Sequence, residues 1–586
     1  DKADNKTGDK KKEVLTAEQQ NRKIRDDLKK RWDRVLKGLE DNDEEEVVNY
    51  FLSALSMAYD PHSDYFSHRE LENFQISMRH SLTGIGAMLG MADGMAEIQG
   101  LVIGGPADKS KKLHVNDRII AVAQGIEGEM VDIVDMRLPK IVEFIRGKKG
   151  SIVRLSVIPA GGDVSEAGEI AIVRDTVELK DKLANAELII TEDTDGQQER
   201  IGWIYLYSFY ADMNGGSTST TTDVRRLLDR LIKENIDGLV LDLRSNGGGS
   251  LEEAINLTGL FIPRGPVVQS KDWRAHADFR RSRNKYPLYD GPLVVLTDKA
   301  SASASEILAA ALQDYNRAII IGEKSTFGKG TVQTIMPVSR QMPIFSDKER
   351  AGALKVTIQK FYRIAGGSTQ LKGVEPDLVI PSRSDFLDFG EESLDNPLGY
   401  DTIDPQQFIA VNEDPFPIAE LKHRMLPRIT GNQDFQYVLE DGARLKDRLD
   451  KNVMSINKQA RIEENETNRL RNEARTAERR KRYAAVEKAE KDLFEVYKLT
   501  LDNVDETTLT LRDDFSDEES SGMIMASHDD KDGGEKALVF PHKFDPVKRE
   551  TLEILSDYVA IERKEAGHTV KISETAGSPG TAVRVP

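Results

Sequence analysis

Residues 301–333 read SASASEILAAALQDYNRAIIIGEKSTFGKGTVQ. Small residues open this stretch, an apolar helix pattern follows, and a short apolar strand then leads into a glycine loop and a second strand. This order of turn, helix and strand predicts an α/β layer, in which functional groups gather at the carboxyl ends of the strands. The stretch therefore places a serine cluster and Lys329 at the edges of one layer.

The serine cluster has two interpretations. Ser303 and Glu306 have the spacing of a helix capping box, and Ser301 or Ser305 would cap the helix equally well, at about 1 kcal/mol each. A cap needs only one serine, however, and a nucleophile at a strand-to-helix turn would have the same sequence. The helix N-terminus would then stabilise the negative charge that develops beside the nucleophile.

Lys329 also has two interpretations. The segment that begins at Gly322 nearly matches a phosphate-binding P-loop, but five residues rather than four separate Gly322 from Gly328, and Gly330 stands where a hydroxyl residue is required. A strand pattern follows where a P-loop needs a helix. As a general base, Lys329 needs a pKa lowered from about 10.4 towards 7 or 8, which burial can supply. Gln333 shares a strand face with Lys329 and can orient its amine.

A glycine run lies upstream of the serine cluster. The apolar periodicity predicts a helix over residues 222–235 and a buried strand over 236–244, followed by three glycines at 247–249. These glycines join the strand to the next helix and leave backbone N–H groups unobstructed at its N-terminus. Such a turn is a platform for an anion or for an oxyanion.

Residues 77–175 consist of short strand patterns, glycine turns and one amphipathic helix. The apolar face of that helix comprises Val134, Leu138, Ile141, Val142 and Ile145. The turn at Gly84, Ile85 and Gly86 offers successive N–H groups that suit a carboxylate. Its spacing does not fit a dinucleotide fingerprint, and ordinary hairpin glycines are the remaining alternative. With the later GGPADKS turn, the segment resembles a PDZ domain, in which Ile85 and Gly86 would bind a peptide C-terminus.

Both ends of the chain have helical patterns and many charges. His62, Asp64 and His68 lie in one polar segment, but they contain no histidine pair at helical i, i+4 spacing, so a capped turn is favoured over a metal site. A basic run at residues 479–482 is flanked by glutamates, which favours a solvated helix face over a nucleic-acid site.

The composition limits the class of protein. A chain of 586 residues predicts about four domains, and its net charge of −18 repels phosphate backbones. Without cysteine, the chain has no disulfide, no zinc–thiolate site and no cysteine nucleophile. No apolar run approaches the length of a membrane span. The start at Asp1 suggests a processed or truncated chain whose targeting segment is not in this sequence.

Four motifs occur in order: LDLRSNGGGSLEEA (241–254), DKASASASEILAAALQD (298–314), GEKSTFGKGTVQ (322–333) and GVEPD (373–377). Together they resemble the tail-specific, or C-terminal processing, proteases, which are serine peptidases with a Ser–Lys dyad. The PDZ-like segment and the helical C-terminal part match the larger periplasmic type of Gram-negative bacteria. The resemblance implies a multidomain α+β and α/β protein with an N-terminal helical region (1–76), a PDZ-like domain (77–176), an α/β protease core (177–385) and a C-terminal helical region (386–586).

The resemblance also implies roles for individual residues. The implied dyad is Ser303 as nucleophile and Lys329 as general base, oriented by Gln333. The implied oxyanion hole comprises Gly248, Gly249 and Ala304, the supporting residues are Asp314 and Glu306, and the peptide C-terminus would bind at Gly84, Ile85 and Gly86. The loop before Lys329 is one residue longer than the family pattern.

The expected partners follow from the same resemblance. They are protein substrates with apolar C-termini, a lipoprotein adaptor, and further copies of the chain that associate through the helical regions. We expect no cofactor, metal ion or nucleic acid, and we expect a periplasmic location. The alternative function is a PDZ-containing chaperone or scaffold whose protease fold is inactive.

Overall fold

The computed structural model describes residues 16–40, 42–192, 196–212, 218–341, 351–490, 494–512, 523–525 and 545–575. The chain forms two compact units. We call Asp1–Leu71 with Thr334–Val356 the N-terminal unit, and Glu72–Gln333 with Thr357–Pro586 the main unit. Within the described ranges, no helix combines the length and the hydropathy needed to cross a membrane.

The N-terminal unit is built from helices, as its sequence pattern predicts. Its elements are α1 (Ala17–Glu40), α2 (Glu44–Met57), β1 (Asp64–Phe66) and the short α9 (Val338–Gln341). Asp43 caps α2 by accepting a hydrogen bond from the Glu46 N–H (3.0 Å). Strand β1 pairs with the start of β18 (Ala353–Tyr362) in antiparallel register. Helix α3 (His68–Arg79) then leads into the main unit.

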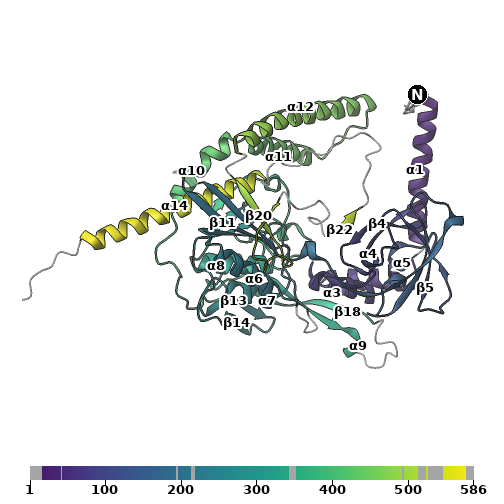
Figure 1. Cartoon of the computed structure of the whole chain (residues 1–586), viewed down its shortest axis with the longest axis horizontal. Coiled ribbons are helices and arrows are strands. Elements are labelled where there is room, and N and C mark those ends of the chain that lie inside the picture. The colour runs from purple at the N-terminus through teal and green to yellow at the C-terminus, as the bar shows by residue number, and fades with distance from the viewer. Residues whose placement is uncertain are drawn as a thin grey trace, which may run out of the picture. The chain divides into compact units, whose positions relative to one another are not determined.

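The PDZ-like part of the main unit is a small sheet with two helices (Figure 1). Its strands are β3 (Ala87–Ala92), β4 (Met95–Val102), β5 (Arg118–Gln124), β6 (Val131–Asp132), β7 (Ile152–Ile158) and β8 (Gly168–Val173). Its helices are α4 (Pro106–Ser110) and α5 (Leu138–Ile145). A separate ribbon, β2 (Ser81–Gly84) with β9 (Asp175–Glu178), connects this sheet to the rest of the unit. The predicted helix face was wrong at Val134, because α5 begins only at Leu138, where Pro139 fits the first turn.

The α/β core of the main unit contains an eight-stranded sheet of order β19-β16-β15-β12-β11-β10-β20-β21. Its parallel strands are β11 (Gln198–Tyr205), β12 (Gly238–Asp242), β15 (Leu293–Thr297), β16 (Ile319–Gly322) and β19 (Leu378–Val379). Strand β10 (Asn185–Glu192) adds an antiparallel edge. The central strands are buried throughout, because helices cover both faces of the sheet.

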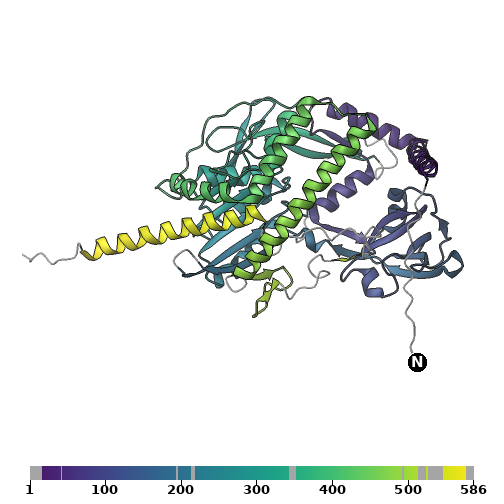
Figure 2. The ribbon, with the colours of Figure 1, turned by 90° about the horizontal axis from the view of Figure 1, so that it is seen from above.

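Two groups of helices cover the sheet. On one face lie α6 (Thr220–Lys233), α7 (Leu251–Thr258) and α8 (Ala304–Asp314). The apolar stripe of α6 is buried in this core, which agrees with the predicted helix to within two residues at each end. On the other face lie α10 (Ile418–Gly431) and the first half of α14 (Pro546–Thr575). The rest of α14 projects away from the sheet (Figure 2).

A second sheet lies beside this core. It contains β13 (Gly265–Asp272), β14 (Ala277–Ser282), β17 (Thr331–Pro337) and β18. Strand β18 therefore belongs to both units, with its first residues paired to β1 and its last residues paired to β13. Strand β17 follows the glycine loop that carries Lys329, as the sequence pattern predicts.

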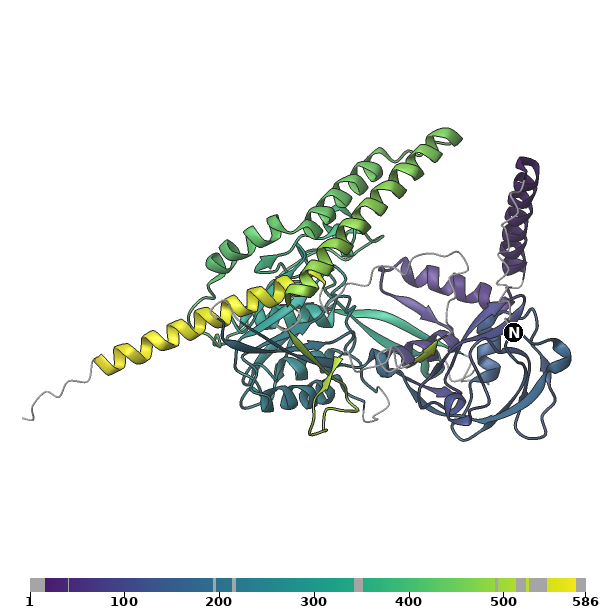
Figure 3. The same ribbon diagram turned by 45° about the horizontal axis from the view of Figure 1, so that its top comes forward.

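The C-terminal region is mostly helical, as predicted for residues 386–586, and it also contributes three short strands. Helices α11 (Gln433–Lys451) and α12 (Lys458–Glu490) form a long antiparallel hairpin (Figure 3). After them, β20 (Glu495–Leu499) and β21 (Thr510–Leu511) extend the core sheet, and β22 (Met523–Met525) pairs with β4. The pairing partner of β20 is β10, which lies about three hundred residues earlier, so no local pattern reveals it.

Candidate functional site

Ser303 lies at the turn between β15 and α8 in an unusual backbone conformation. Its φ of +57° and ψ of −109° lie where a residue with a side chain is strained. The neighbouring hydroxyls are committed to structure, because Ser301 Oγ donates to the Leu243 carbonyl (2.8 Å) and Ser305 Oγ donates to the Asn246 carbonyl (2.9 Å). The turn therefore distinguishes Ser303 from the other two serines of the cluster.

Glu306 joins the serine turn to the lysine loop. Its Oε2 accepts hydrogen bonds from the N–H of Ser303 (2.6 Å) and from the N–H of Lys329 (3.0 Å). Because both nitrogens bond the same oxygen, they lie no more than 5.6 Å apart. Its Oε1 accepts from the Thr326 hydroxyl (2.6 Å) and the Gly328 N–H (2.7 Å). One carboxylate thus holds the backbone of both predicted dyad residues.

The Glu306 side chain is fully buried, and burial raises its pKa to about 7. The four hydrogen bonds that it accepts act in the opposite direction, because they stabilise the charged form. The sequence pattern places Glu306 in a capping box with Ser303, which involves only its own helix. The structure shows that its side chain reaches beyond its own helix to the loop before β17.

Further contacts hold the lysine loop against the serine turn. The Phe327 N–H donates to the Ser301 carbonyl (3.0 Å). Gln370 accepts from the Gly330 N–H (2.7 Å), and the Thr369 hydroxyl donates to the Lys329 carbonyl (2.9 Å). Sequence reasoning missed Thr369 and Gln370, because they lie about forty residues after the loop that they bind.

The glycine run 247–249 packs directly on the serine turn. A Cβ atom on Gly248 would lie 2.9 Å from Ser303 Cβ and 3.1 Å from the Ala304 nitrogen, so only glycine fits there. Gly248 and Gly249 also have positive φ values of 100° and 144°. The Gly248 N–H donates to Asn246 Oδ1 (2.9 Å), which commits that amide in this structure. The oxyanion role of Gly248 stays a prediction, and it requires this hydrogen bond to open.

Gln333 lies on β17 and donates through Nε2 to two threonine hydroxyls, those of Thr331 and Thr357, each at 2.9 Å. The shared face of Thr331 and Gln333 agrees with strand alternation. The orientation of the Lys329 amine by Gln333 stays a prediction. The strand after Lys329 also contradicts the P-loop alternative, which needs a helix N-terminus at this point.

The predicted tail-binding turn lies at the end of β2. Ile85 is buried, and Gly86 has a φ of +76° and would bring a Cβ atom against Gly105 and Val177. The carbonyls of Ile85 and Gly86 accept from Ala107 (2.8 Å) and Val102 (2.9 Å). Among the described residues, neither the Ile85 N–H nor the Gly86 N–H donates a hydrogen bond, which leaves both N–H groups available to a carboxylate.

Comparison with known protein families agrees with this arrangement along the chain. Residues 4–69 match the tail specific protease N-terminal domain, 73–158 a PDZ domain, 200–380 peptidase family S41, and 384–560 the C-terminal domain of tail specific protease. A carboxyl-terminal-processing protease of Picosynechococcus sp. is 30% identical over 332 residues, which are 56% of this chain and 71% of that protein. The chain belongs to peptidase family S41.

A second curated relative and a solved domain structure show how much of this S41 chain is matched. A tail-specific protease of Haemophilus influenzae is 38% identical over 480 residues, which are 81% of this chain and 66% of that protein. The S41 chain thus spans about two thirds of that relative. The solved PDZ domain of a carboxy-terminal protease from Vibrio cholerae, in complex with peptide, is 47% identical over 17% of this chain and 99% of its own, with a TM-score of 0.16.

Asp314, the other supporting residue predicted for this S41 chain, ends α8 and pairs with Arg363. Arg363 donates to its carboxylate through both Nε and Nη2, and the Asp314 side chain is only 6% exposed. This pair ties the helix that begins at Ser303 to the end of β18. Asp314 thus lies at the opposite end of α8 from Ser303, and its role as a supporting residue stays a prediction.

We predict that Asp314→Ala lowers the free energy of unfolding of this S41 chain by about 3 kcal/mol, because it leaves the partly buried Arg363 guanidinium without its carboxylate. Asp314→Asn keeps a hydrogen-bond acceptor and should lose less. Urea unfolding of both variants measures the difference. Equal stability of wild type and Asp314→Ala would contradict this role.

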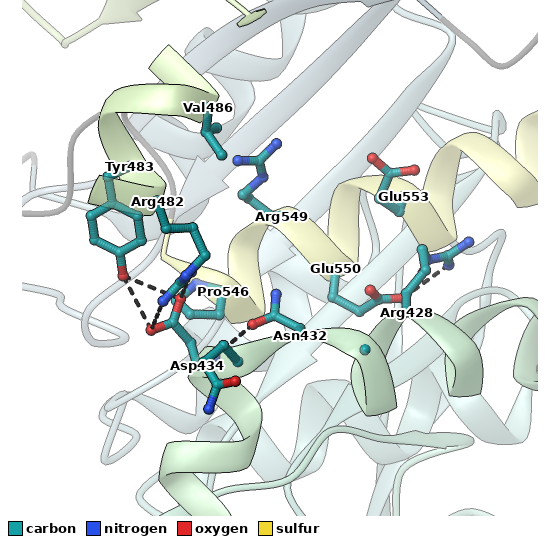
Figure 4. Close-up of a pocket in the computed structure, with 12 residues that line it drawn as sticks. Arg428, Asn432, Asp434, Arg482, Tyr483, Val486, Pro546, Arg549, Glu550 and Glu553 are labelled. Atoms are coloured by element: carbon teal, nitrogen blue, oxygen red, sulfur yellow. Dashed lines mark hydrogen bonds and ion pairs between the residues drawn. The ribbon is translucent and has the colours of Figure 1, made fainter. Parts of the chain in front are cut away.

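A hollow of about 420 Å³ lies apart from the serine turn, among α10, α11, α12 and α14 (Figure 4). Its charged side chains bond across it: Asp434 accepts from Arg482 (2.7 Å), and Glu550 accepts from Arg428 (2.9 Å). Burial raises the pKa of Glu550 to about 7. These ion pairs join helices from different parts of the chain, so we assign the hollow a structural role in the S41 chain.

Proposed function

We propose that this chain is a serine endopeptidase that binds apolar C-terminal tails of proteins on its PDZ-like part and cleaves upstream through Ser303 and Lys329. The observation that carries the proposal is the pair of hydrogen bonds from the Ser303 and Lys329 N–H groups to one oxygen of Glu306. Family membership supports the reaction class. The glycine run packed on the serine turn supports the oxyanion step.

In the proposed reaction, the Lys329 amine removes the proton of the Ser303 hydroxyl as its oxygen attacks the substrate carbonyl. The N–H groups of Gly249 and Ala304 stabilise the oxyanion, and Gly248 joins them only if its bond to Asn246 opens. The C–N bond breaks, and the leaving amine takes the proton from Lys329. Water then attacks the acyl carbon as Lys329 takes its proton, the C–Oγ bond breaks, Ser303 Oγ takes the proton from Lys329, and the acid is released.

Tail recognition makes this proposal testable. Two unfolded reporters that differ only in their last residues, apolar or acidic, should be cleaved at rates that differ about tenfold or more. Burial of one apolar side chain is worth about 1.5–3 kcal/mol, which is at least a tenfold change in affinity. The measurement is the initial rate for both reporters, with Ser303→Ala as background. Equal cleavage rates for the two reporters would contradict tail recognition. Binding of the apolar tail without any cleavage would favour the alternative of an inactive scaffold.

The remaining predicted partners belong to the same proposal. Family resemblance supports a periplasmic location, a lipoprotein adaptor and self-association through helical regions. The helices of the N-terminal unit leave large apolar side chains exposed, including Trp32 at 68% and Phe51 at 66%. Mass measurements on the chain alone and with an adaptor would test both associations.

A further inference from the structure

His80 lies at the junction between α3 and β2, where the PDZ-like part begins. It has a positive φ of 49°, and its ring is half-buried. A hydrogen bond of 2.7 Å joins its Nε2 to the Ser208 hydroxyl, and its ring lies 5.2 Å from the Tyr210 ring, centroid to centroid. Both partners belong to the loop that follows β11 of the protease core.

Backbone hydrogen bonds hold the same junction. The Ala211 N–H donates to the carbonyl of Met78 (2.8 Å), which lies in the last turn of α3. The Leu179 N–H donates to the His80 carbonyl (2.8 Å), just after β9. His80 is thus fixed by its backbone to the PDZ ribbon and by its side chain to the protease core.

The loop that His80 contacts also forms one wall of the catalytic turn. The Phe209 N–H donates to the Gly248 carbonyl (2.9 Å), and the Ser250 N–H donates to the Phe209 carbonyl (2.7 Å). A Cβ atom on Gly249 would lie 2.2 Å from the Phe209 oxygen. The Phe209 backbone therefore fixes the position of Gly248 and Gly249. Since Gly248 packs on Ser303, a shift of this loop would change the oxyanion geometry.

We propose that His80 is a positioning residue for cleavage, acting through Ser208 and the Phe209 backbone on the glycines at 248 and 249. The inference rests on the proposed peptidase function. His80 touches neither predicted dyad residue in these contacts, so it acts by setting the position of the loop. Its removal should lower kcat and leave both tail binding and KM nearly unchanged.

His80 is one of the residues that line a cleft of about 1010 Å³. Burial and Lys182 lower the pKa of His80 below 6.5, while Asp181 opposes them. Other charged or titratable residues also line this cleft. They include Arg79, Glu178, Lys180, Tyr205, Tyr207, Asp223 and Arg226. Because the pKa is depressed, the ring is neutral above pH 6.5, and a fall in pH through the lowered pKa places a disfavoured positive charge at this junction.

The test compares His80→Ala, Ser208→Ala, the double variant and His80→Gln in the full chain, on the apolar-tailed reporter at about pH 8. We expect kcat to fall about five- to tenfold in each alanine variant, with no further fall in the double variant, because one hydrogen bond is lost in all three. His80→Gln should recover most of kcat, since its amide can bond Ser208. His276→Ala replaces an exposed histidine of the protease core and serves as the control.

The pH profile separates positioning from general stability. The ratio of wild-type to His80→Gln kcat should be constant above pH 6.5 and should fall below pH 6.5, because glutamine does not titrate. The effect of Lys329 protonation on kcat is common to both proteins and cancels in the ratio. A flat ratio, or additive single effects, would overturn the role of His80. Unfolding midpoints show whether each variant is folded, and His80→Gln tests the contact even if His80→Ala is not.

Failure of this inference is distinguishable from failure of the proposed function. If wild type cleaves the reporter no faster than Ser303→Ala, the peptidase proposal fails, and the His80 inference fails with it. If wild type cleaves in a Ser303-dependent manner while His80→Ala and Ser208→Ala keep wild-type kcat, only the positioning role is overturned.

Discussion

Replacing Ser303 or Lys329 by alanine is expected to lower the cleavage rate of an unfolded, apolar-tailed substrate by about a thousandfold or more. The serine oxygen forms the acyl bond, and no neighbour can take its place, because the hydroxyls of Ser301 and Ser305 donate to backbone carbonyls. The lysine amine is the proposed acceptor of the serine proton. Initial rates, together with covalent trapping of the acyl-enzyme, measure both losses.

The loop itself supplies the matched control for this prediction. Lys324 is exposed and lies five residues before Lys329, so Lys324→Ala should keep the wild-type rate within about twofold. Ser305→Ala removes a buried hydrogen bond and should mainly lower stability. Cleavage that survives in Ser303→Ala and disappears in Ser305→Ala would move the nucleophile to Ser305.

Replacing Glu306 by alanine is expected to lower kcat at least a hundredfold and to destabilise the fold by several kcal/mol. The substitution leaves three N–H groups and the Thr326 hydroxyl buried without their acceptor, at about 1–3 kcal/mol each before relaxation. It also releases the serine turn from the lysine loop. Glu306→Gln should be nearly as inactive, because its amide group presents donors to donors. Steady-state kinetics and urea unfolding measure the two effects.

The pH dependence of stability gives an independent check on Glu306. Its pKa is about 7 in the folded protein against 4.5 for the ordinary group, so the folded protein favours the neutral form more than the unfolded chain does. Wild-type stability relative to Glu306→Gln is therefore highest below pH 4.5 and declines by about 3 kcal/mol as the pH rises to 7. If the stability of wild type relative to Glu306→Gln instead increased between pH 4.5 and 7, the folded protein would stabilise the Glu306 anion, which contradicts this prediction.

The sequence predicted those parts of the fold and site that depend on local patterns. The helix over residues 222–235 follows from an apolar stripe, and the strand after Lys329 follows from alternation and the absence of a helix signal. The Ser303–Glu306 spacing indicated a cap, which accounts for one of the four hydrogen bonds of Glu306. Choosing Ser303 among three serines needed family resemblance, and its strained backbone now gives a physical reason.

The parts that sequence reasoning missed depend on distant partners. Gln370 binds Gly330 across forty residues, and β20 pairs with β10 across about three hundred. The short segment of β20 carries Glu, Tyr and Lys, so its strand character comes from the sheet edge that it joins. The bond between His80 and Ser208 joins two loops whose sequences give no sign that they meet.

The late position of β20 in the chain also bears on synthesis. A ribosome would release β10, β11, β12, β15 and β16 long before it released the strand that covers their antiparallel edge. For the time needed to make about three hundred residues, β10 would present an unpaired edge, which is a template for pairing with other chains. The nascent sheet would also lack the apolar cover of α14. Completion of this sheet therefore waits until both β20 and α14 have been synthesised.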